Sequence, residues 1–177
     1  TMSACAMAPM IYGAIPVFAD VDNMGSLDPN SIKTLVSPRT KAILVVHQFG
    51  IPADMDEIMA IAKKHNIRVV EDCAQAHGAK YKGQHVGTIG DIGVFSLNVN
   101  KSIQTGEGGI CITEDDEIAY RLSLIRNHGE AVVGPAEYHR ITNIVGFNFR
   151  LTEIQAAIAR EQLKKLEQLN AHRLHLV

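Results

Sequence analysis

Short apolar runs of strand length alternate along the chain with stretches whose apolar residues recur at helical spacing. The run 42–46 (Ala-Ile-Leu-Val-Val) is apolar on both faces, which is typical of a strand buried in a parallel sheet. Alternating strands and helices predict an α/β fold with a mostly parallel sheet. The strands are predicted at residues 16–21, 42–46, 68–72, 93–96 and 109–113.

The first predicted helix begins at Asp54, a residue type that favours the position just before a helix. Glu57 is expected to reach back to Asp54 and complete a capping box. The helix ends near Asn66. One apolar stripe faces the core: Met55, Ile58, Met59 and Ala62.

Two further helices are predicted nearer the C-terminus. One begins at residues 113–116, and its apolar stripe consists of Ile118, Leu122 and Ile125. The other begins at Thr152 and Gln155, and its stripe is expected in the core or on a dimer surface: Ile154, Ile158, Leu163, Leu166 and Leu169. Residues 129–150 have weak periodicity and are expected to form a long excursion toward a partner subunit.

Residues 1–19 carry no charge, yet the sequence predicts neither a signal peptide nor a membrane span there. Pro9, Gly13 and Pro16 are expected to break any apolar helix, and no basic residue precedes them. Because the chain opens at Thr1 in apolar sequence, it is expected to be a piece of a longer protein.

The composition is that of a folded globular domain. The 177 residues are 46% hydrophobic and 20% charged, which excludes a disordered, collagen-like or coiled-coil chain, and the length suits one domain. A net charge of −2 gives no electrostatic reason to expect nucleic acid or an anionic membrane as partner. The cysteines Cys5, Cys73 and Cys111 form no CxxC pair, which favours a cytoplasmic location.

Metal binding is not predicted. The candidate ligands are two histidine pairs, His77 with His85 and His172 with His175. Neither pair has a cysteine or carboxylate nearby at ligand spacing, so we assign no metal to the chain.

The residues that carry chemistry gather between positions 71 and 109. Asp72 lies where a predicted buried strand ends, and the carboxyl ends of parallel strands are where α/β sheets bind ligands. A carboxylate there is costly unless it meets a cation, but Asp72 is equally suited to cap a following helix. The neighbouring Glu71 is expected to be structural.

Lys101 follows a second predicted strand end, with no carboxylate in the four positions before it. It is either an ordinary solvated lysine or a poised amine nucleophile. Ser96 and the glycine-rich turn 106–109 would suit a phosphate, although the turn is equally a plain hairpin. A pyridoxal phosphate site needs an acid and an amine of this kind: the acid keeps the pyridine nitrogen protonated, and the lysine holds the aldehyde as a Schiff base.

At these residues the sequence resembles the DegT/DnrJ/EryC1/StrS family of pyridoxal-phosphate-dependent aminotransferases, which act mostly on nucleotide-linked keto sugars. The similarity runs over nearly the whole chain, so the motifs in their order are far more specific than any one of them. The matching segments are 16–22, 38–43, 46–50, 71–78, 90–96, 101–109, 126–129, 145–150 and 151–169.

The resemblance implies a three-layer α/β/α fold of type I, with residues 1–177 forming part of the cofactor-binding large domain. The family's N-terminal phosphate loop is expected before Thr1, and its small domain is expected after Val177. Active sites of the family lie between subunits, so a homodimer with shared sites is implied.

The resemblance also assigns roles to single residues. Asp72 would pair with the pyridine nitrogen, Gln75 would lie against the ring and reach its 3-hydroxyl, and Ser96 would hold the phosphate. Lys101 would form the Schiff base and then act as the general base. Asn148 would reach the phosphate bound in the neighbouring subunit.

Three features bear on where the chain stands within the family. Met2 occupies the place of an aromatic residue that stacks on the cofactor ring, and methionine stacks more weakly. Segment 98–100 (Asn-Val-Asn) stands where many members have His-Pro, and it is expected to mark a substrate subgroup. Lys101 argues against the dehydratase branch, in which histidine replaces the lysine.

The implied reaction transfers an amino group from glutamate or glutamine to a keto sugar, in the biosynthesis of amino sugars, cell-surface polysaccharides or secondary metabolites. Two alternatives stay open. The chain is a truncated remnant with only a structural or binding role, or the same scaffold supports another pyridoxal phosphate reaction, such as an elimination, or a sensory role.

Overall fold

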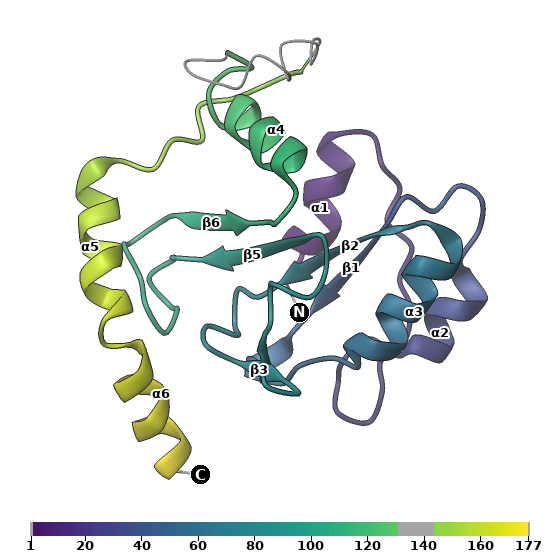
Figure 1. Ribbon diagram of the computed structural model, residues 1–177, viewed down its shortest axis with the longest axis horizontal. Coiled ribbons are helices and arrows are strands. Elements are labelled where there is room, and N and C mark those ends of the chain that lie inside the picture. Colours follow the sequence, from purple (N-terminus) through teal and green to yellow (C-terminus); the bar gives the residue numbers. More distant parts are fainter. Residues whose placement is uncertain (1, 131–143, 177) are drawn as a thin grey trace.

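The computed structural model describes residues 2–130 and 144–176 and shows a four-stranded sheet with helices around it (Figure 1). The order of the strands across the sheet is β1-β2-β5-β6. The first three run parallel and the last is antiparallel, so the predicted α/β fold with a mostly parallel sheet is confirmed. The strands are β1 (Ala42–Val46), β2 (Arg68–Asp72), β5 (Ile92–Ser96) and β6 (Gly109–Ile112).

The register of the strands brings their carboxyl ends to one edge of the sheet. Val46 pairs with Asp72, and Asp72 pairs with Val94, shortly before β5 ends at Ser96. Strand β6 then pairs Gly109 with Ser96 in the antiparallel direction. The ends of β1, β2 and β5 therefore meet at the edge where parallel sheets bind ligands.

Helices α2 (Pro29–Leu35) and α3 (Met55–His65) pack with β1 and β2 to form the main core. Three of the four predicted stripe residues of α3 are buried, whereas Met59 is partly buried and Ile61 is buried as well. Burying a large side chain of this kind stabilises a fold by about 1.5–3 kcal/mol. The buried cluster comprises Ile32, Ile43, Val45, Ala53, Met55, Ile58, Ile61, Ala62, Ile67 and Val69.

The start of α3 confirms Asp54 as the capping residue but not the reciprocal capping box. The Asp54 carboxylate accepts from the Glu57 N–H at 3.4 Å. The Glu57 side chain instead pairs with Lys33 of α2 at 3.1 Å, because α2 lies beside it. The helix ends at Asn66, as predicted, in the left-handed conformation.

Helix α4 (Asp116–Arg126) begins where the sequence predicts, with Asp115 accepting from the Ile118 N–H at 3.1 Å. Its buried residues are Tyr120 and Leu124, which lie on the opposite side of the helix from the predicted stripe. The stripe itself is only half-buried. Both sides of the helix carry apolar residues, and tertiary packing covers the side with Tyr120 and Leu124 more completely than the predicted stripe.

The predicted C-terminal helix is divided into α5 (Glu153–Leu163) and α6 (Leu166–His175). Helix α5 begins after Thr152, as the sequence predicts, and Thr152 and Gln155 form a complete capping box there. The apolar stripe does not enter the core of the described chain: Ile154 is 75% exposed and Leu163 is 59% exposed. The alternative, a dimer surface, stays a prediction.

The N-terminal segment forms helix α1 (Ala4–Ile11), so the prediction that Pro9 breaks any helix there is wrong. Proline lacks the N–H that would bond to the Cys5 carbonyl, and the helix ends soon after it, at Ile11. Among the residues described, no helix is both long and apolar enough to cross a membrane.

Two other predicted segments have different outcomes. Residues 16–21 do not form a strand, because they find no partner strand in the described chain and make only an isolated bridge between Val21 and Leu27. The excursion predicted at 129–150 falls largely on residues 131–143, which lie outside the described residues.

A short hairpin, β3 (Lys80–Tyr81) and β4 (Gln84–His85), follows the turn after β2. Both residues at its tip, 82–83, have positive φ, as in turns of type I′. The Tyr81 hydroxyl donates to the Asp54 carboxylate at 2.9 Å. The hairpin is thereby attached to the start of α3.

Candidate active site

Two connections leave the carboxyl edge of the sheet side by side: the turn after β2 and the loop that joins β5 to β6. His77 Nε2 donates to the Ser96 carbonyl oxygen at 2.8 Å and fastens the turn to the end of β5. Asp72 is the last residue of β2, the turn carries Gln75, Ser96 is the last residue of β5, and the loop carries Lys101. Four of the five predicted site residues thus belong to this one region.

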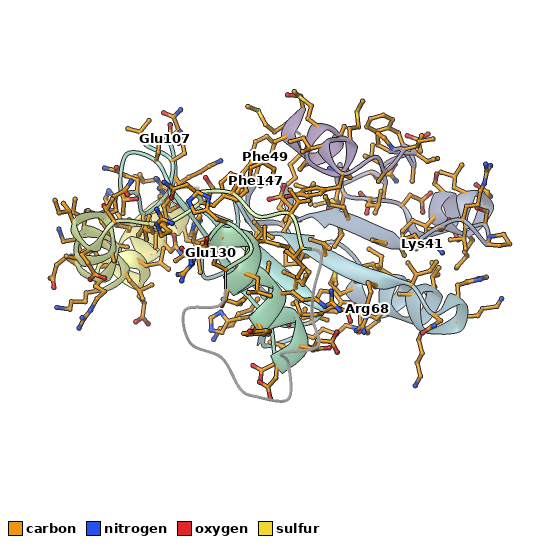
Figure 2. All side chains as sticks on the ribbon, turned by 90° about the horizontal axis from the view of Figure 1, so that it is seen from above. Lys41, Phe49, Arg68, Glu107, Glu130 and Phe147 are labelled. Carbon is orange, nitrogen blue, oxygen red and sulfur yellow. The ribbon has the colours of Figure 1, made fainter. Side chains whose placement is uncertain are left out.

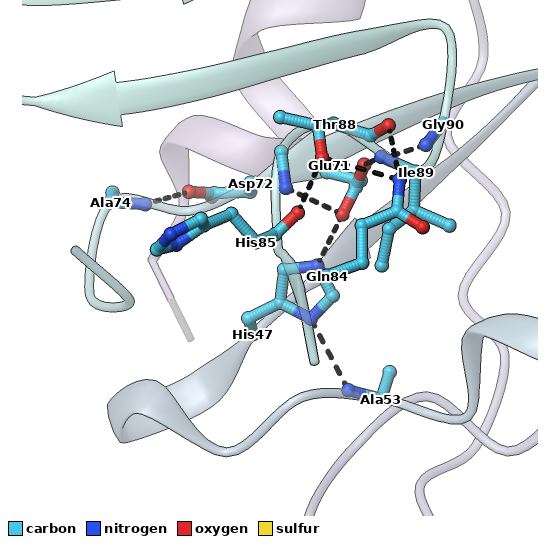
Figure 3. Close-up of polar contacts among 11 residues, drawn as sticks. His47, Ala53, Glu71, Asp72, Ala74, Gln84, His85, Thr88, Ile89 and Gly90 are labelled. Carbon is cyan, nitrogen blue, oxygen red and sulfur yellow. Dashed lines mark hydrogen bonds and ion pairs between the residues drawn. The ribbon is translucent and has the colours of Figure 1, made fainter. Parts of the chain in front are cut away.

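The Asp72 carboxylate uses its two oxygens differently. Oδ1 accepts from the Ala74 N–H at 2.9 Å (Figure 3). Residues 73–79 form turns and no helix, so the expected helix cap is wrong and Asp72 caps a turn instead. Oδ2 accepts from the Cys5 thiol at 3.0 Å. A thiol is a weak donor, and within the described chain Asp72 has no ion-pair partner, so Oδ2 can still accept from a stronger donor.

Cys5 is a site neighbour that the sequence analysis missed. It reaches Asp72 from helix α1 across 67 positions of sequence. Burial, and then the hydrogen bond and negative charge of Asp72, raise the pKa of the Cys5 thiol. The thiol therefore stays protonated and remains a donor. No pattern in a single sequence pairs residues this far apart.

Gln75 is fastened to the end of β1 through the short helix η1 (Gln48–Gly50). Its Oε1 accepts from the Phe49 N–H at 3.0 Å. Phe49 has φ of 55°, an uncommon value for an aromatic residue, and is 75% exposed. The side-chain NH₂ of Gln75 has no hydrogen-bond partner among the described residues, so it is available to a ligand.

Lys101 is half-buried, and within residues 2–130 and 144–176 its amine has no hydrogen-bond or ion-pair partner. Ser96 Oγ accepts from the Asn98 N–H at 3.2 Å, which leaves the hydroxyl proton available for donation. Burial lowers the pKa of His77, and the positive charge of Lys101 lowers it further. The hydrogen bond to the Ser96 carbonyl raises the pKa but does not outweigh them. His77 is therefore neutral, and its buried Nδ1 has no partner in the part of the chain described.

Asn148 lies apart from the other predicted site residues. It forms an isolated antiparallel bridge with Asn127 at the end of α4, and its side-chain oxygen accepts from the Arg150 N–H at 3.5 Å. The Arg150 guanidinium donates to the Asn127 side chain at 2.8 Å. Exposed Asn148 has no hydrogen bond to the other four residues within the described chain, so a role in the neighbouring subunit stays a prediction.

Glu71 is fully buried and holds the loop before β5 in place (Figure 3). One carboxylate oxygen accepts from His47 Nε2 at 2.9 Å and from the Gly87 N–H at 2.7 Å. The other accepts from the N–H groups of Ile89 at 2.8 Å and Gly90 at 2.6 Å. These bonds support the structural role expected for Glu71 and fix the residue next to Asp72.

His47 completes this buried network. Its Nδ1 accepts from the Ala53 N–H at 3.2 Å, so Nε2 carries the proton donated to Glu71. In the described residues, His47, Glu71 and Cys73 form a group whose possible metal-ligand atoms lie within 4.8 Å of one another. The His47 and Glu71 atoms are already bonded, and burial raises the pKa of the Cys73 thiol, so hydrogen bonding explains the cluster and we assign it no metal.

Glu71→Gln is expected to lower the free energy of unfolding by about 3–5 kcal/mol, because an amide NH₂ would face buried N–H donors. Burial would raise the Glu71 pKa, but the bonds from His47 and three backbone N–H groups outweigh it and hold the pKa below its ordinary 4.5. The carboxylate's contribution is therefore complete above pH 4.5 and is lost as the pH falls through the lower folded-state value. Urea denaturation of the complete protein at several pH values measures both effects.

The exposed ion pair between Glu57 and Lys33 supplies the control. Glu57→Gln is expected to change the free energy of unfolding by less than about 1 kcal/mol. If Glu71→Gln were as stable as the parent protein at neutral pH, the buried network would not contribute to folding in the way described.

Known proteins resemble this chain in sequence and structure. It is 45% identical over 172 residues to the UDP-N-acetyl-3-dehydro-alpha-D-glucosamine 3-aminotransferase of Acidithiobacillus ferrooxidans, a match that covers 96% of this chain and 45% of that relative. It is 39% identical over 181 residues to the L-glutamine:2-deoxy-scyllo-inosose aminotransferase of Streptoalloteichus tenebrarius, covering 97% and 43%. The crystal structure of the aminotransferase from Psychrobacter cryohalolentis superposes with a TM-score of 0.86 and 41% identity, covering 95% of this chain and 45% of that one.

The chain thus spans somewhat less than half the length of these relatives. The sequence model of the DegT/DnrJ/EryC1/StrS aminotransferases matches it from residue 1 to residue 177. That match extends over all the strands and both connections at the carboxyl edge. The chain therefore belongs to the DegT/DnrJ/EryC1/StrS aminotransferase family.

Proposed function

We propose that residues 1–177 are part of the large domain of a pyridoxal-phosphate-dependent enzyme that transfers an amino group from glutamate or glutamine to a nucleotide-linked keto sugar. The supporting observation is a pair of groups at one edge of the sheet. Within the described chain Lys101 has an amine without a partner, and Asp72 has a carboxylate oxygen with only a thiol donor. Membership of the family supports the reaction class.

The residues at this edge fit pyridoxal phosphate by the chemistry of their available groups. Asp72 Oδ2 would accept from the protonated ring nitrogen, and the NH₂ of Gln75 would serve the ring hydroxyl. The Ser96 hydroxyl would donate to the phosphate, with Asn148 of a second subunit as a further donor. When bound, the cofactor supplies an aldehyde for covalent attachment and a ring that withdraws electrons from the reacting carbon.

Lys101 and Asp72 divide the proton chemistry between them. Lys101 Nζ would hold the cofactor covalently, and the free amine would take the proton from the Cα of the amino donor as general base. The carboxylate of Asp72 keeps a proton on the ring nitrogen, because an ion pair at that atom favours its charged form. Each role requires that the Lys101 amine and the Asp72 carboxylate form no ion pair with other protein side chains. Among the described residues neither of them does.

The names of the relatives guide the choice of substrates. One is named for a UDP-linked 3-dehydro sugar and another for glutamine and a ketocyclitol. We therefore expect glutamate or glutamine as donor and a keto sugar on a nucleotide as acceptor, with a ketocyclitol as the competing acceptor class.

A half-reaction assay tests the proposed function. The complete protein encoded by the reading frame that contains residues 1–177 is loaded with pyridoxal phosphate and mixed with L-glutamate or L-glutamine. Conversion of the bound cofactor to its amine form, followed by absorbance, is expected with an L-amino donor and not with D-glutamate. Absence of conversion with every donor, or release of an elimination product, would refute the transaminase proposal.

The same reading frame decides between an enzyme and a remnant. A frame that continues on both sides into sequence of the family's length supports the enzyme. A frame closed at residues 1–177, whose product traps no cofactor on Lys101, supports a structural or binding remnant instead.

A further inference from the structure

The loop that carries Lys101, here called loop 97–108, is closed by its own hydrogen bonds. Leu97 N–H donates to the Gly108 carbonyl at 2.8 Å, and Val99 N–H donates to the Gly106 carbonyl at 2.8 Å. These bonds continue the pairing of β5 with β6 beyond the strand ends. Lys101 therefore lies on a hairpin loop whose first limb, residues 97–99, pairs with its second limb, residues 106–108. The position of Lys101 depends on the contacts that hold these two limbs.

Asn98 is the residue that fastens the first limb, since all four of its polar groups are engaged. Its N–H donates to Ser96 Oγ at 3.2 Å, and its carbonyl accepts from the Lys101 N–H at 3.0 Å. Its side-chain Oδ1 accepts from the Asn100 N–H at 3.1 Å, and Nδ2 donates to Glu107 Oε1 at 2.9 Å. Asparagine is favoured at the start of a tight turn because its side-chain oxygen can accept a hydrogen bond from the backbone N–H two residues later.

Glu107 fastens the second limb to the rest of the molecule. Its carbonyl oxygen accepts from the Thr105 hydroxyl at 2.8 Å and from the Gln155 side chain of α5 at 2.9 Å. Figure 2 shows Glu107 on the loop beside α5, on the opposite side of the molecule from Lys41. The Asn98–Glu107 bond thus joins the turn that ends at Lys101 to a limb already held by a helix.

We propose that Asn98 and Glu107 are positioning residues for Lys101, with the bond between their side chains holding the 98–101 turn in the conformation that presents the lysine amine to the cofactor site. The proposal rests on the proposed function. It differs from the expectation that Asn98 marks a substrate subgroup, because its side chain is committed within the loop. The role is to place Lys101, and neither residue acts on the substrate.

A polarity swap isolates this bond. Asn98→Asp keeps the turn acceptor but sets two carboxylates against each other. Glu107→Gln added to it returns a donor–acceptor pair and restores the original net charge of the two positions. Asn98→Ala removes both side-chain bonds without changing charge, and Val99→Ala changes an exposed neighbour in the same turn as the control.

Two measurements are made on the complete protein and each variant. Borohydride trapping of cofactor on Lys101 across pyridoxal phosphate concentrations gives an apparent dissociation constant, and hydrogen exchange of the peptide covering 98–103 reports the turn without cofactor. We expect Asn98→Ala and Asn98→Asp to weaken trapping about tenfold and to speed exchange, as loss of one to two hydrogen bonds would. The double variant should return both values to within about twofold, and Val99→Ala should change neither.

The outcomes separate the two proposals. If the parent protein traps no cofactor, the proposed function fails, while exchange still decides whether Asn98 holds the turn. Unchanged exchange in Asn98→Ala, or no recovery in the double variant, overturns the positioning role even when trapping in the parent is normal. A urea midpoint measured for each variant confirms that the chain is folded in every comparison.

Discussion

Lys101→Ala is expected to abolish turnover and the covalent attachment of pyridoxal phosphate in the complete protein. In the proposed function Lys101 Nζ both holds the aldehyde and takes the proton from the donor's Cα, so one substitution removes two roles. A positioned general base alone contributes about 10²–10⁴-fold to a rate, so the combined loss should be at least that large. Borohydride trapping with peptide mass spectrometry measures attachment, and steady-state kinetics measures turnover.

Two controls show whether the effect belongs to this amine. Lys101→Arg keeps a positive charge on the loop but removes an amine that can bond to an aldehyde, so it should be as inactive as alanine. Lys41→Ala, at the far end of the molecule in Figure 2, should keep attachment and turnover. Trapped cofactor or substantial turnover in Lys101→Ala would remove Lys101 from its assigned role.

The two strands that the sequence predicted with the observed bounds bury one face in the core, and the residues between the buried ones are partly buried or exposed. Runs 42–46 and 68–72 became β1 and β2 because apolar side chains at their centres pack into the core. Run 16–21 has a similar apolar content, but Val17 is 69% exposed and Phe18 is 78% exposed. A strand also requires a neighbouring strand, and a residue pattern does not show whether one is present.

The sequence could predict those residues of the candidate site that lie at or just after the end of a strand. Asp72 and Lys101 were found in this way, because the carboxyl ends of parallel strands share one edge. The Cys5 contact with Asp72 depends on the path of α1, a helix that the sequence did not predict. Asn98 was noticed only as a departure from the family pattern, because its bond to Glu107 depends on how the loop closes.

The same dependence on tertiary contacts bears on the two interpretations of Asp72, a structural cap and a cofactor-binding acid. One oxygen caps the backbone at Ala74, which is the structural role, and the other is left with the Cys5 thiol, which is compatible with the cofactor role. A substitution that keeps the first contact and removes the charge can therefore separate the two interpretations. Asparagine is that substitution, since its side-chain oxygen still accepts from a backbone N–H.

Asp72→Asn is expected to fold normally and bind cofactor through Lys101, but to turn over about 10²–10³-fold more slowly. That is the cost of removing one electrostatic partner from a developing charge in an active site. Asp72→Ala should be equally slow and should in addition lose about 1 kcal/mol of stability with the hydrogen bond from the Ala74 N–H. Half-reaction rates with L-glutamate, together with urea midpoints, measure the two effects separately.

The comparison between the variants gives the decision. If Asp72 acts only as a cap, Asp72→Asn will react at the parent rate and Asp72→Ala alone will be impaired, through its stability. If the carboxylate keeps the ring nitrogen protonated, both variants will be slow, and the asparagine variant will be slow while as stable as the parent. A slow, stable Asp72→Asn protein is the result that the geometry at the end of β2 leads us to expect, because the oxygen that meets the Cys5 thiol contributes little to the fold.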